Sequence, residues 1–149
     1  MKKFKFSLDK VLVHRNIQVD LAKKEFMDAE NILDAEIKKL EDMKDRKQTA
    51  LNQRTEAVQG SLSWANSVDQ INNFLSGQDL RIKKQNERLL DCRKVVESRR
   101  EILQEALTAA KMIERLREKK KVQYFREVSI NEQKEIDELS VIRFSKMEN

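Results

Sequence analysis

The stretch "VQGSLSWANSV", residues 58–68, holds the only cluster of small polar residues in a chain whose apolar residues otherwise recur regularly. Glycine together with serine and asparagine is typical of a turn. We therefore expect the chain to reverse direction at about residues 59–66. The residues that follow, "SVDQ" at 67–70, fit a capping box and predict that a second helix starts near Ser67.

The residues before this turn predict one long helix, from about residue 7 to about residue 58. Ser7 is placed to cap its first turn, because its hydroxyl can accept a bond from a free backbone N–H. From residue 12 onward, positions spaced alternately three and four apart form a heptad row, and ten of the 14 are apolar when alanine is counted. The row consists of Leu12, Arg15, Val19, Ala22, Phe26, Ala29, Leu33, Glu36, Leu40, Met43, Lys47, Ala50, Arg54 and Ala57.

The residues after the turn predict a second helix, from about residue 67 to about residue 143. Gly77 is expected to be a soft point within this helix, at a cost of about 1 kcal/mol relative to alanine. A second heptad row follows, in which nine of 13 positions are apolar. It consists of Ile82, Gln85, Leu89, Cys92, Val96, Arg99, Leu103, Ala106, Ala110, Ile113, Arg117, Lys120 and Tyr124.

Two heptad helices joined by a short turn must pair antiparallel. The sequence therefore predicts an all-α fold: a long antiparallel two-helix coiled coil, an α-hairpin, forming a single domain over residues 1–149. If both helices leave the turn together, Leu8 lies level with about residue 117. The residues after that point form a C-terminal helical overhang.

The composition agrees with a coiled coil and disfavours an enzyme. The chain has no proline and two glycines, 38% of its residues are charged and 5% are aromatic. A two-helix rod offers no obvious concave site, and a single His14 is more often a surface residue than a ligand. We expect no catalytic residues, no metal and no cofactor. The single Cys92 fits a reducing cytosol, and no apolar run is long enough to span a membrane.

The net charge of +5 is concentrated in residues 111–126, called the basic segment below, which carry seven cations and two anions. A solvated helix end is one interpretation of such a run. Nucleic acid is another, although no nucleic-acid-binding motif frames these residues. Membrane binding would need a broad apolar face opposite the cations. A protein partner with an acidic or polar cavity fits best.

Both ends of the chain resemble one family. "FKFSLDKVLVHRNIQVDLAKKEF" (4–26) is similar to the opening of the flagellar FliJ proteins, and "IERLREKKKVQYFREVSINEQKEIDEL" (113–139) is similar to their C-terminal signature. The resemblance implies an antiparallel coiled coil of the flagellar type III export apparatus, similar in shape to the central stalk of rotary ATPases. It also implies a cytoplasmic protein, peripheral at the inner-membrane export apparatus.

The resemblance further implies three kinds of partner: the export ATPase hexamer, the cytoplasmic domain of the export gate membrane protein, and export chaperones. No nucleic acid and no membrane insertion are expected. The end that binds and stimulates the ATPase ring would include Leu8, Leu12, Arg15, Gln133, Lys134, Asp137 and Glu138, and we add Arg115 and Lys119, which share one face of the basic segment. The gate-facing surface would fall on Phe74, Gln78, Arg81 and Gln85.

Two alternatives remain open at the level of the sequence. One is a coiled-coil adaptor that binds nucleic acid or an acidic partner through the basic segment. The other is the equivalent stalk protein of an injectisome, which shares the same plan.

Overall fold

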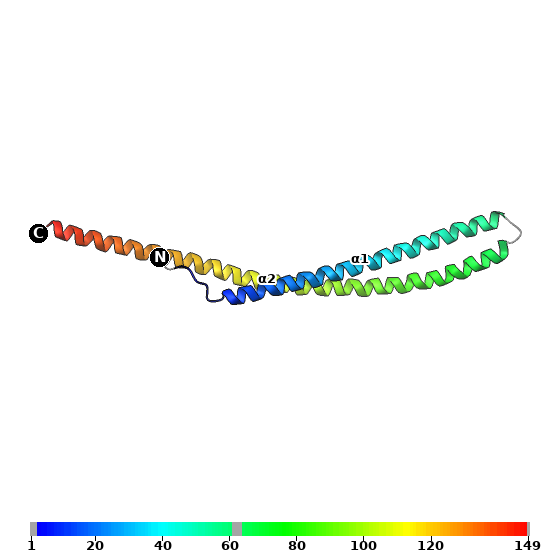
Figure 1. Ribbon diagram of the computed structural model, residues 1–149, viewed down its shortest axis with the longest axis horizontal. Helices are drawn as coiled ribbons and strands as arrows, with labels where there is room; N and C mark the ends of the chain where they lie inside the picture. The colour runs from blue at the N-terminus through cyan, green and yellow to red at the C-terminus, as the bar shows by residue number, and fades with distance from the viewer. Residues whose placement is uncertain (1–2, 61–63, 149) are drawn as a thin grey trace. The chain divides into compact units, whose positions relative to one another are not determined.

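The computed structural model describes residues 3–60 and 64–148, and within them it consists of two helices and no strand. Helix α1 spans Asp9–Gly60 and helix α2 spans Trp64–Met147, and the two run antiparallel (Figure 1). The predicted all-α antiparallel hairpin is therefore confirmed. The helices hold 52 and 84 residues without a proline to break them.

The helix ends differ slightly from the predicted ones. The first backbone hydrogen bond of α1 joins the Leu12 N–H to the Leu8 carbonyl at 2.9 Å, so the capping position falls on Leu8 rather than Ser7. Helix α2 begins at Trp64, so the capping box expected at Ser67 lies within its first turn. Serine and asparagine are only a few tenths of a kcal/mol poorer helix formers than their neighbours, and an established helix extends through them. The expected turn at residues 59–66 includes residues 61–63, which lie outside the described residues.

Gly77 does not interrupt α2, which is helical on both sides of it. It has no positive φ angle, so its backbone is that of an ordinary helical residue. The expected soft point is therefore part of a continuous helix.

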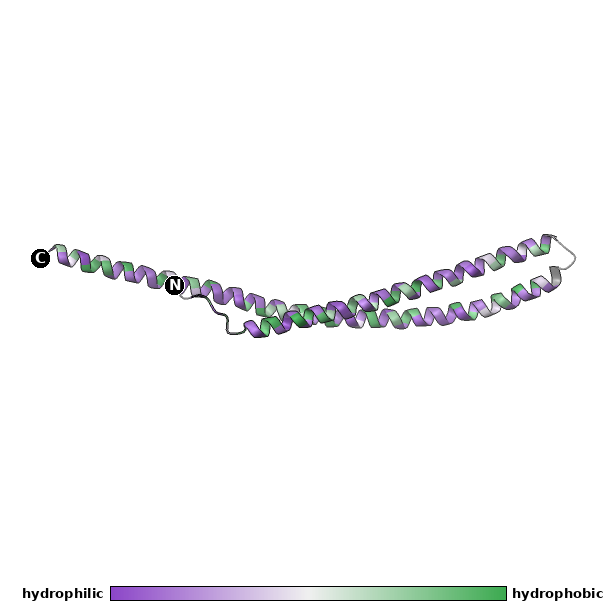
Figure 2. Ribbon diagram, in the orientation of Figure 1, coloured by the Kyte–Doolittle hydropathy of each residue, from purple (hydrophilic) through white to green (hydrophobic). Residues whose placement is uncertain are grey.

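The chain divides into two compact units, residues 21–103 and residues 1–20 with 104–149. In the first unit, every member of both predicted heptad rows is buried or half-buried. Its most buried apolar side chains are Ala22, Ala29, Leu40, Ala50, Leu75, Leu89 and Val96. Green apolar turns alternate with purple polar ones along both helices in Figure 2, as expected where each helix buries a single stripe.

In the second unit the start of the chain lies against α2. Phe6, Leu12, Val19 and Ala110 are buried, and the ion pair between Arg117 Nε and Asp9 Oδ1, at 3.6 Å, matches the predicted level of the helices. Three predicted row positions are exposed here, Arg15, Arg117 and Lys120. Leu116 is half-buried in place of Arg117, since a straight helix drifts by about 20° per heptad from a strict seven-residue repeat.

The predicted overhang is present in α2, but its exposed part begins later than residue 117, because the start of the chain packs against α2 as far as Tyr124. Val128 is the last half-buried residue, and every residue from Ser129 to Glu148 is exposed. We call residues 129–148 the tail.

Candidate interaction surfaces

The residues expected to face an ATPase ring lie in one unit but differ in exposure. Leu12 is buried and Leu8 is half-buried, so both belong to the packing between the start of the chain and α2. The remaining seven are exposed: Arg15, Arg115, Lys119, Gln133, Lys134, Asp137 and Glu138. Gln133 donates a hydrogen bond of 3.0 Å to Asp137, which links two of them on the tail.

Aromatic residues at the end of the basic segment pack against the start of the chain. The rings of Phe4 and Tyr124 are 5.7 Å apart and tilted by 49°, and the ring of Phe125 meets that of Tyr124 edge-on at 5.6 Å. A cavity of about 510 Å³ beside them is lined by both aromatic and charged residues, among them Lys5 and Lys120. Tyr124 therefore has a packing role, and the cations next to it are left facing outward.

The four residues of the expected gate-facing surface do not form one exposed face. Gln78 is 3% exposed and donates a hydrogen bond of 2.8 Å to the Met43 carbonyl of α1. Gln85 is 7% exposed and donates bonds of 2.9 and 2.7 Å to the backbone carbonyl and the carboxylate of Glu36. Both glutamines thus hold α2 on α1, which leaves Phe74 and Arg81 as the members that offer side chains to a partner.

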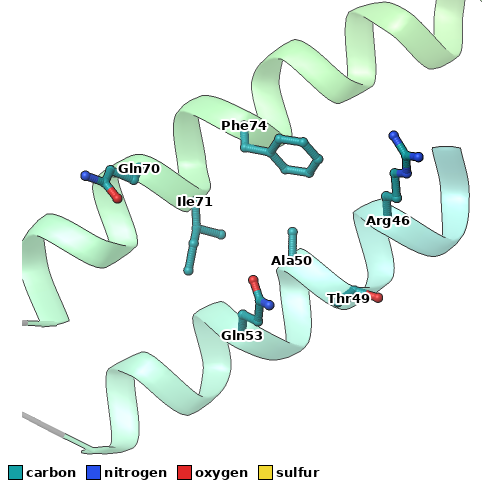
Figure 3. A pocket seen from close by; sticks show the side chains of 7 residues that line it. All are labelled: Arg46, Thr49, Ala50, Gln53, Gln70, Ile71 and Phe74. Carbon is teal, nitrogen blue, oxygen red and sulfur yellow. The ribbon is translucent and has the colours of Figure 1, made fainter.

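Phe74 lines a shallow apolar groove between the helices, and Arg81 lies next to the Phe74 ring. The Arg81 guanidinium stands 6.0 Å from the centre of the Phe74 ring, and its Nη1 donates a 3.0 Å bond to Gln78. In Figure 3, Phe74 and Ile71 of α2 reach toward Ala50 of α1, at the wall of a groove of about 360 Å³. Phe74 remains 39% exposed, so the ring is accessible at the mouth of this groove.

Glu36 is a buried charge that was not among the predicted functional residues. It is 4% exposed, and Lys39 and Arg88 lie 3.1 and 3.3 Å from its carboxylate. The hydrogen bonds from Gln85 and Lys39 lower the pKa of the Glu36 carboxyl, and burial opposes them only in part. The signal was in the sequence: Glu36 and Gln85 are polar members of the two heptad rows at nearly the same level.

Within residues 3–60 and 64–148, no cluster of histidine, cysteine and acidic residues is arranged to hold a metal ion. In the same ranges, neither helix has a stretch that is apolar enough to cross a membrane.

Comparison with known proteins identifies the family to which the sequence is similar. Residues 4–149 match the family described as Flagellar FliJ protein. The chain is also similar to a solved structure described as that of a YscO homolog, CT670, from Chlamydia trachomatis, with a TM-score of 0.73 and 20% sequence identity over 94% of each chain. At that identity the likeness concerns the fold. Among curated proteins, no sequence matches the chain.

Proposed function

The chain belongs to the flagellar FliJ family, and from this premise we propose that it is a stalk-like coiled coil that binds and stimulates the export ATPase ring. In this role it contacts the export gate, escorts export chaperones and has no catalytic activity of its own. It works in the cytoplasm, at the periphery of the inner-membrane export apparatus. The match over residues 4–149 carries the proposal.

The proposed ring contact uses the exposed side chains of the second unit. Arg15, Arg115 and Lys119 supply positive charge, while Gln133, Lys134, Asp137 and Glu138 supply mixed polar groups on the tail. A shaft that touches several subunits in turn benefits from solvated, charge-rich contacts, because each of them contributes little and can be exchanged. Leu8 and Leu12 support this end from within rather than by touching the ring.

The proposed gate contact uses Phe74 as its apolar anchor. Aromatic and arginine side chains are the usual energetic centres of protein interfaces. Here Phe74 lines the groove, and the Arg81 guanidinium stands 6.0 Å from its ring. Gln78 and Gln85 serve this surface indirectly, since they fix the helices on which it is built.

The ring contact is tested by reversing two charges, Arg115→Glu with Lys119→Glu. We expect the affinity for the export ATPase, measured from the dependence of ATPase stimulation on the concentration of this chain, to fall about tenfold, because exposed charges contribute up to about 1 kcal/mol each. The loss should shrink as salt rises, since the Debye length falls from about 10 Å at 0.1 M to about 3 Å at 1 M.

The matched control reverses two exposed lysines of the other unit, Lys83→Glu with Lys94→Glu, which changes the net charge equally. If the control impairs stimulation as much as the test variant, net charge and not the ring contact is responsible. Titration with labelled duplex and single-stranded DNA covers the nucleic-acid alternative. Sequence-independent binding tighter than about micromolar at physiological salt would favour that alternative.

A further inference from the structure

A second apolar groove lies between α1 and α2 within residues 21–103. It measures about 330 Å³, and Ile32 and Val95, which line it, are 56% and 50% exposed. The heptad-row members Ala29 and Cys92 line it as well. Apolar side chains that are exposed next to one another, rather than singly, mark sites of protein contact.

This second groove and the groove beside Phe74 open on the same side of the hairpin. We call the members of the heptad rows core residues and extend the row of α2 back to Ile71. On a helix of 3.6 residues per turn, residues that directly precede a core residue lie on one side, and those that directly follow one lie on the other. Every residue that lines either groove is a core residue or directly precedes one. We call this side the groove side.

Four exposed cations stand on the groove side between the two grooves or at their near ends. Each directly precedes a core residue, and they are Lys39 and Arg46 of α1 and Arg81 and Arg88 of α2. The bond between Gln78 and Met43 aligns the helices. Arg81 comes three residues after Gln78, so it lies nearly level with Lys39 on the antiparallel α1.

Facing cations are unexpected in a hairpin that has only its own two helices to hold together. Positions beside the core of a coiled coil usually carry opposite charges that pair between the helices. The other side of this unit follows that rule, since Lys47 of α1 contacts Asp79 of α2 at 2.7 Å. On the groove side, Arg81 instead bonds to the neutral Gln78.

The groove side keeps an excess of positive charge between the grooves. Within residues 35–49 and 77–91, the residues that directly precede a core residue include five cations and two anions. The buried Glu36 carboxylate adds one further negative charge, which Lys39 and Arg88 share at 3.1 and 3.3 Å. A net charge of two positive units remains, and it lies beside exposed apolar surface.

We propose that the groove side binds an acidic amphipathic helix of a partner protein, which lies along the hairpin as the third helix of a coiled coil. Its apolar residues fill the two grooves, and its carboxylates meet the four cations between them. The groove side of a second copy does not fit, because it would set cations against cations. The gate contact concerns only the Phe74 end of this surface, so the inference does not rest on it.

The spacing of the grooves gives the length of the partner helix. Ala50 lines the groove beside Phe74 and Ala29 lines the second one, and they are 21 residues apart, which is three heptads. At 1.5 Å per residue this distance is about 32 Å. The partner helix therefore needs at least three heptads, with apolar residues at both ends and glutamate or aspartate in the middle.

A designed peptide tests the proposal with the full chain and without any ATPase or gate protein. The peptide is a labelled helix of about four heptads, with leucine at its core positions and glutamate beside them, and a second peptide carries lysine in place of glutamate. We expect fluorescence anisotropy to give a dissociation constant of about 1 μM for the glutamate peptide and one at least about tenfold higher for the lysine peptide. The glutamate peptide should also slow alkylation of Cys92, because this single cysteine lines the second groove.

One pair of variants tests the cations. Arg46→Glu with Arg81→Glu should weaken binding of the glutamate peptide about tenfold or more, and the lysine peptide should then bind more tightly. Lys38→Glu with Lys83→Glu is the matched control, because both lysines are exposed, neither directly precedes a core residue, and the net charge changes equally. This control should bind the glutamate peptide as wild type does.

A second pair of variants tests the apolar grooves. Ile32→Ser with Val95→Ser should weaken binding of the glutamate peptide about tenfold, because the two exposed side chains that line the second groove are lost. Leu80→Ser with Leu90→Ser is the control, since these leucines are 63% and 56% exposed but line neither groove. Circular dichroism checks that all four variant chains remain helical.

Three results would overturn the proposal, and each leaves the ring and gate contacts standing. One is a chain that binds both peptides equally or neither of them. Another is self-association of the chain that disappears in the Ile32→Ser, Val95→Ser variant, which would assign the groove side to a second copy. The last is binding of duplex DNA that is lost in the Arg46→Glu, Arg81→Glu variant and kept in the Ile32→Ser, Val95→Ser variant, which would assign the cations to nucleic acid.

Discussion

Glu36 is a charged residue at a position that the heptad spacing places between the helices. Its carboxylate accepts a hydrogen bond from Gln85 across the interface and is approached by Lys39 and Arg88. A buried carboxylate is tolerated only when such partners replace water. The heptad row predicted that Glu36 is buried. The spacing of apolar residues does not show how a charge inside the row contributes to stability.

The pH dependence of stability should reveal this carboxylate. Because folding lowers the pKa of Glu36, its contribution is fully present above the ordinary value of 4.5 and is lost as pH falls through the lowered value. We therefore expect wild type to melt higher than Glu36→Gln at neutral pH, and the difference to close as pH falls below 4.5. Thermal unfolding followed by circular dichroism over that range measures it. Glu30→Gln, at an exposed site, is the control. A difference that stayed constant with pH would contradict the assignment.

Gln78 is buried and Phe74 is partly exposed, which is the reverse of the usual burial of an aromatic and a polar residue. Gln78→Ala should cost about 1–3 kcal/mol of stability, because it removes a buried side chain and its bond to the Met43 carbonyl. Phe74→Ala should cost less, since the ring is 39% exposed, but it should weaken binding to the gate domain. Chemical denaturation and a gate-domain binding assay separate the two effects. A Phe74→Ala variant that is the less stable of the two would place this ring in the core.

At the scale of the elements, the regular heptads could be predicted and their edges could not. Both rows in residues 21–103 are buried or half-buried as expected, because a repeated apolar spacing leaves one face to bury. The ends depend on a few local hydrogen bonds of small energy, so the cap fell on Leu8 and α2 began at Trp64.

The gate-facing residues show a second limit of the sequence. The spacing of Phe74, Gln78, Arg81 and Gln85 places them near one face of α2, but it does not say what that face meets. Gln85 already belonged to the predicted heptad row, and extending the row backwards by one heptad reaches Gln78. Polar residues in such a row belong to the helix interface as much as apolar ones, and their acceptors on α1 become visible only once the helices are aligned.

Gly77 offers a direct test of helix continuity. A Cβ atom added there would lie 3.6 Å from Arg81 Nη2, which is ordinary van der Waals contact. Gly77→Ala should therefore stabilise the protein by about 0.5–1 kcal/mol, because glycine loses more backbone entropy in a helix than alanine. The free energy of unfolding in denaturant measures this. A destabilised variant would show that this position requires a residue without a side chain.

For the whole molecule, membership of the FliJ family places the chain in flagellar export, and the two units divide its proposed contacts. The second unit presents the basic segment and the tail, and the first unit presents Phe74 and Arg81. The overall hairpin could be read from the sequence because local helix pairing determines it. The partners could not, since a solvated helix face and a docking face have the same composition.

Removal of the tail should separate fold from function. Truncation after Val128 deletes residues that are exposed from Ser129 to Glu148, so the thermal midpoint should hardly change. Stimulation of the export ATPase should be lost, because Gln133, Lys134, Asp137 and Glu138 go with it. Circular dichroism and an ATPase assay measure the two results. A truncated chain that still stimulates fully would contradict the proposed role of the tail.

The two glutamine bonds have a consequence for how the hairpin finds its alignment. Gln78 and Gln85 are seven residues apart, and so are their acceptors, Met43 and Glu36. If α2 slid along α1 by one heptad, one glutamine would again meet a carbonyl, so backbone bonding alone tolerates a shifted hairpin. The Glu36 carboxylate opposes a shift in one direction, because Cys92 and Val95 would then replace Gln85 and Arg88, which bond to it in the native alignment. A shift in the other direction would bring Gln78 and Arg81 to the same carboxylate, so the apolar residues of the two rows must select the native alignment there.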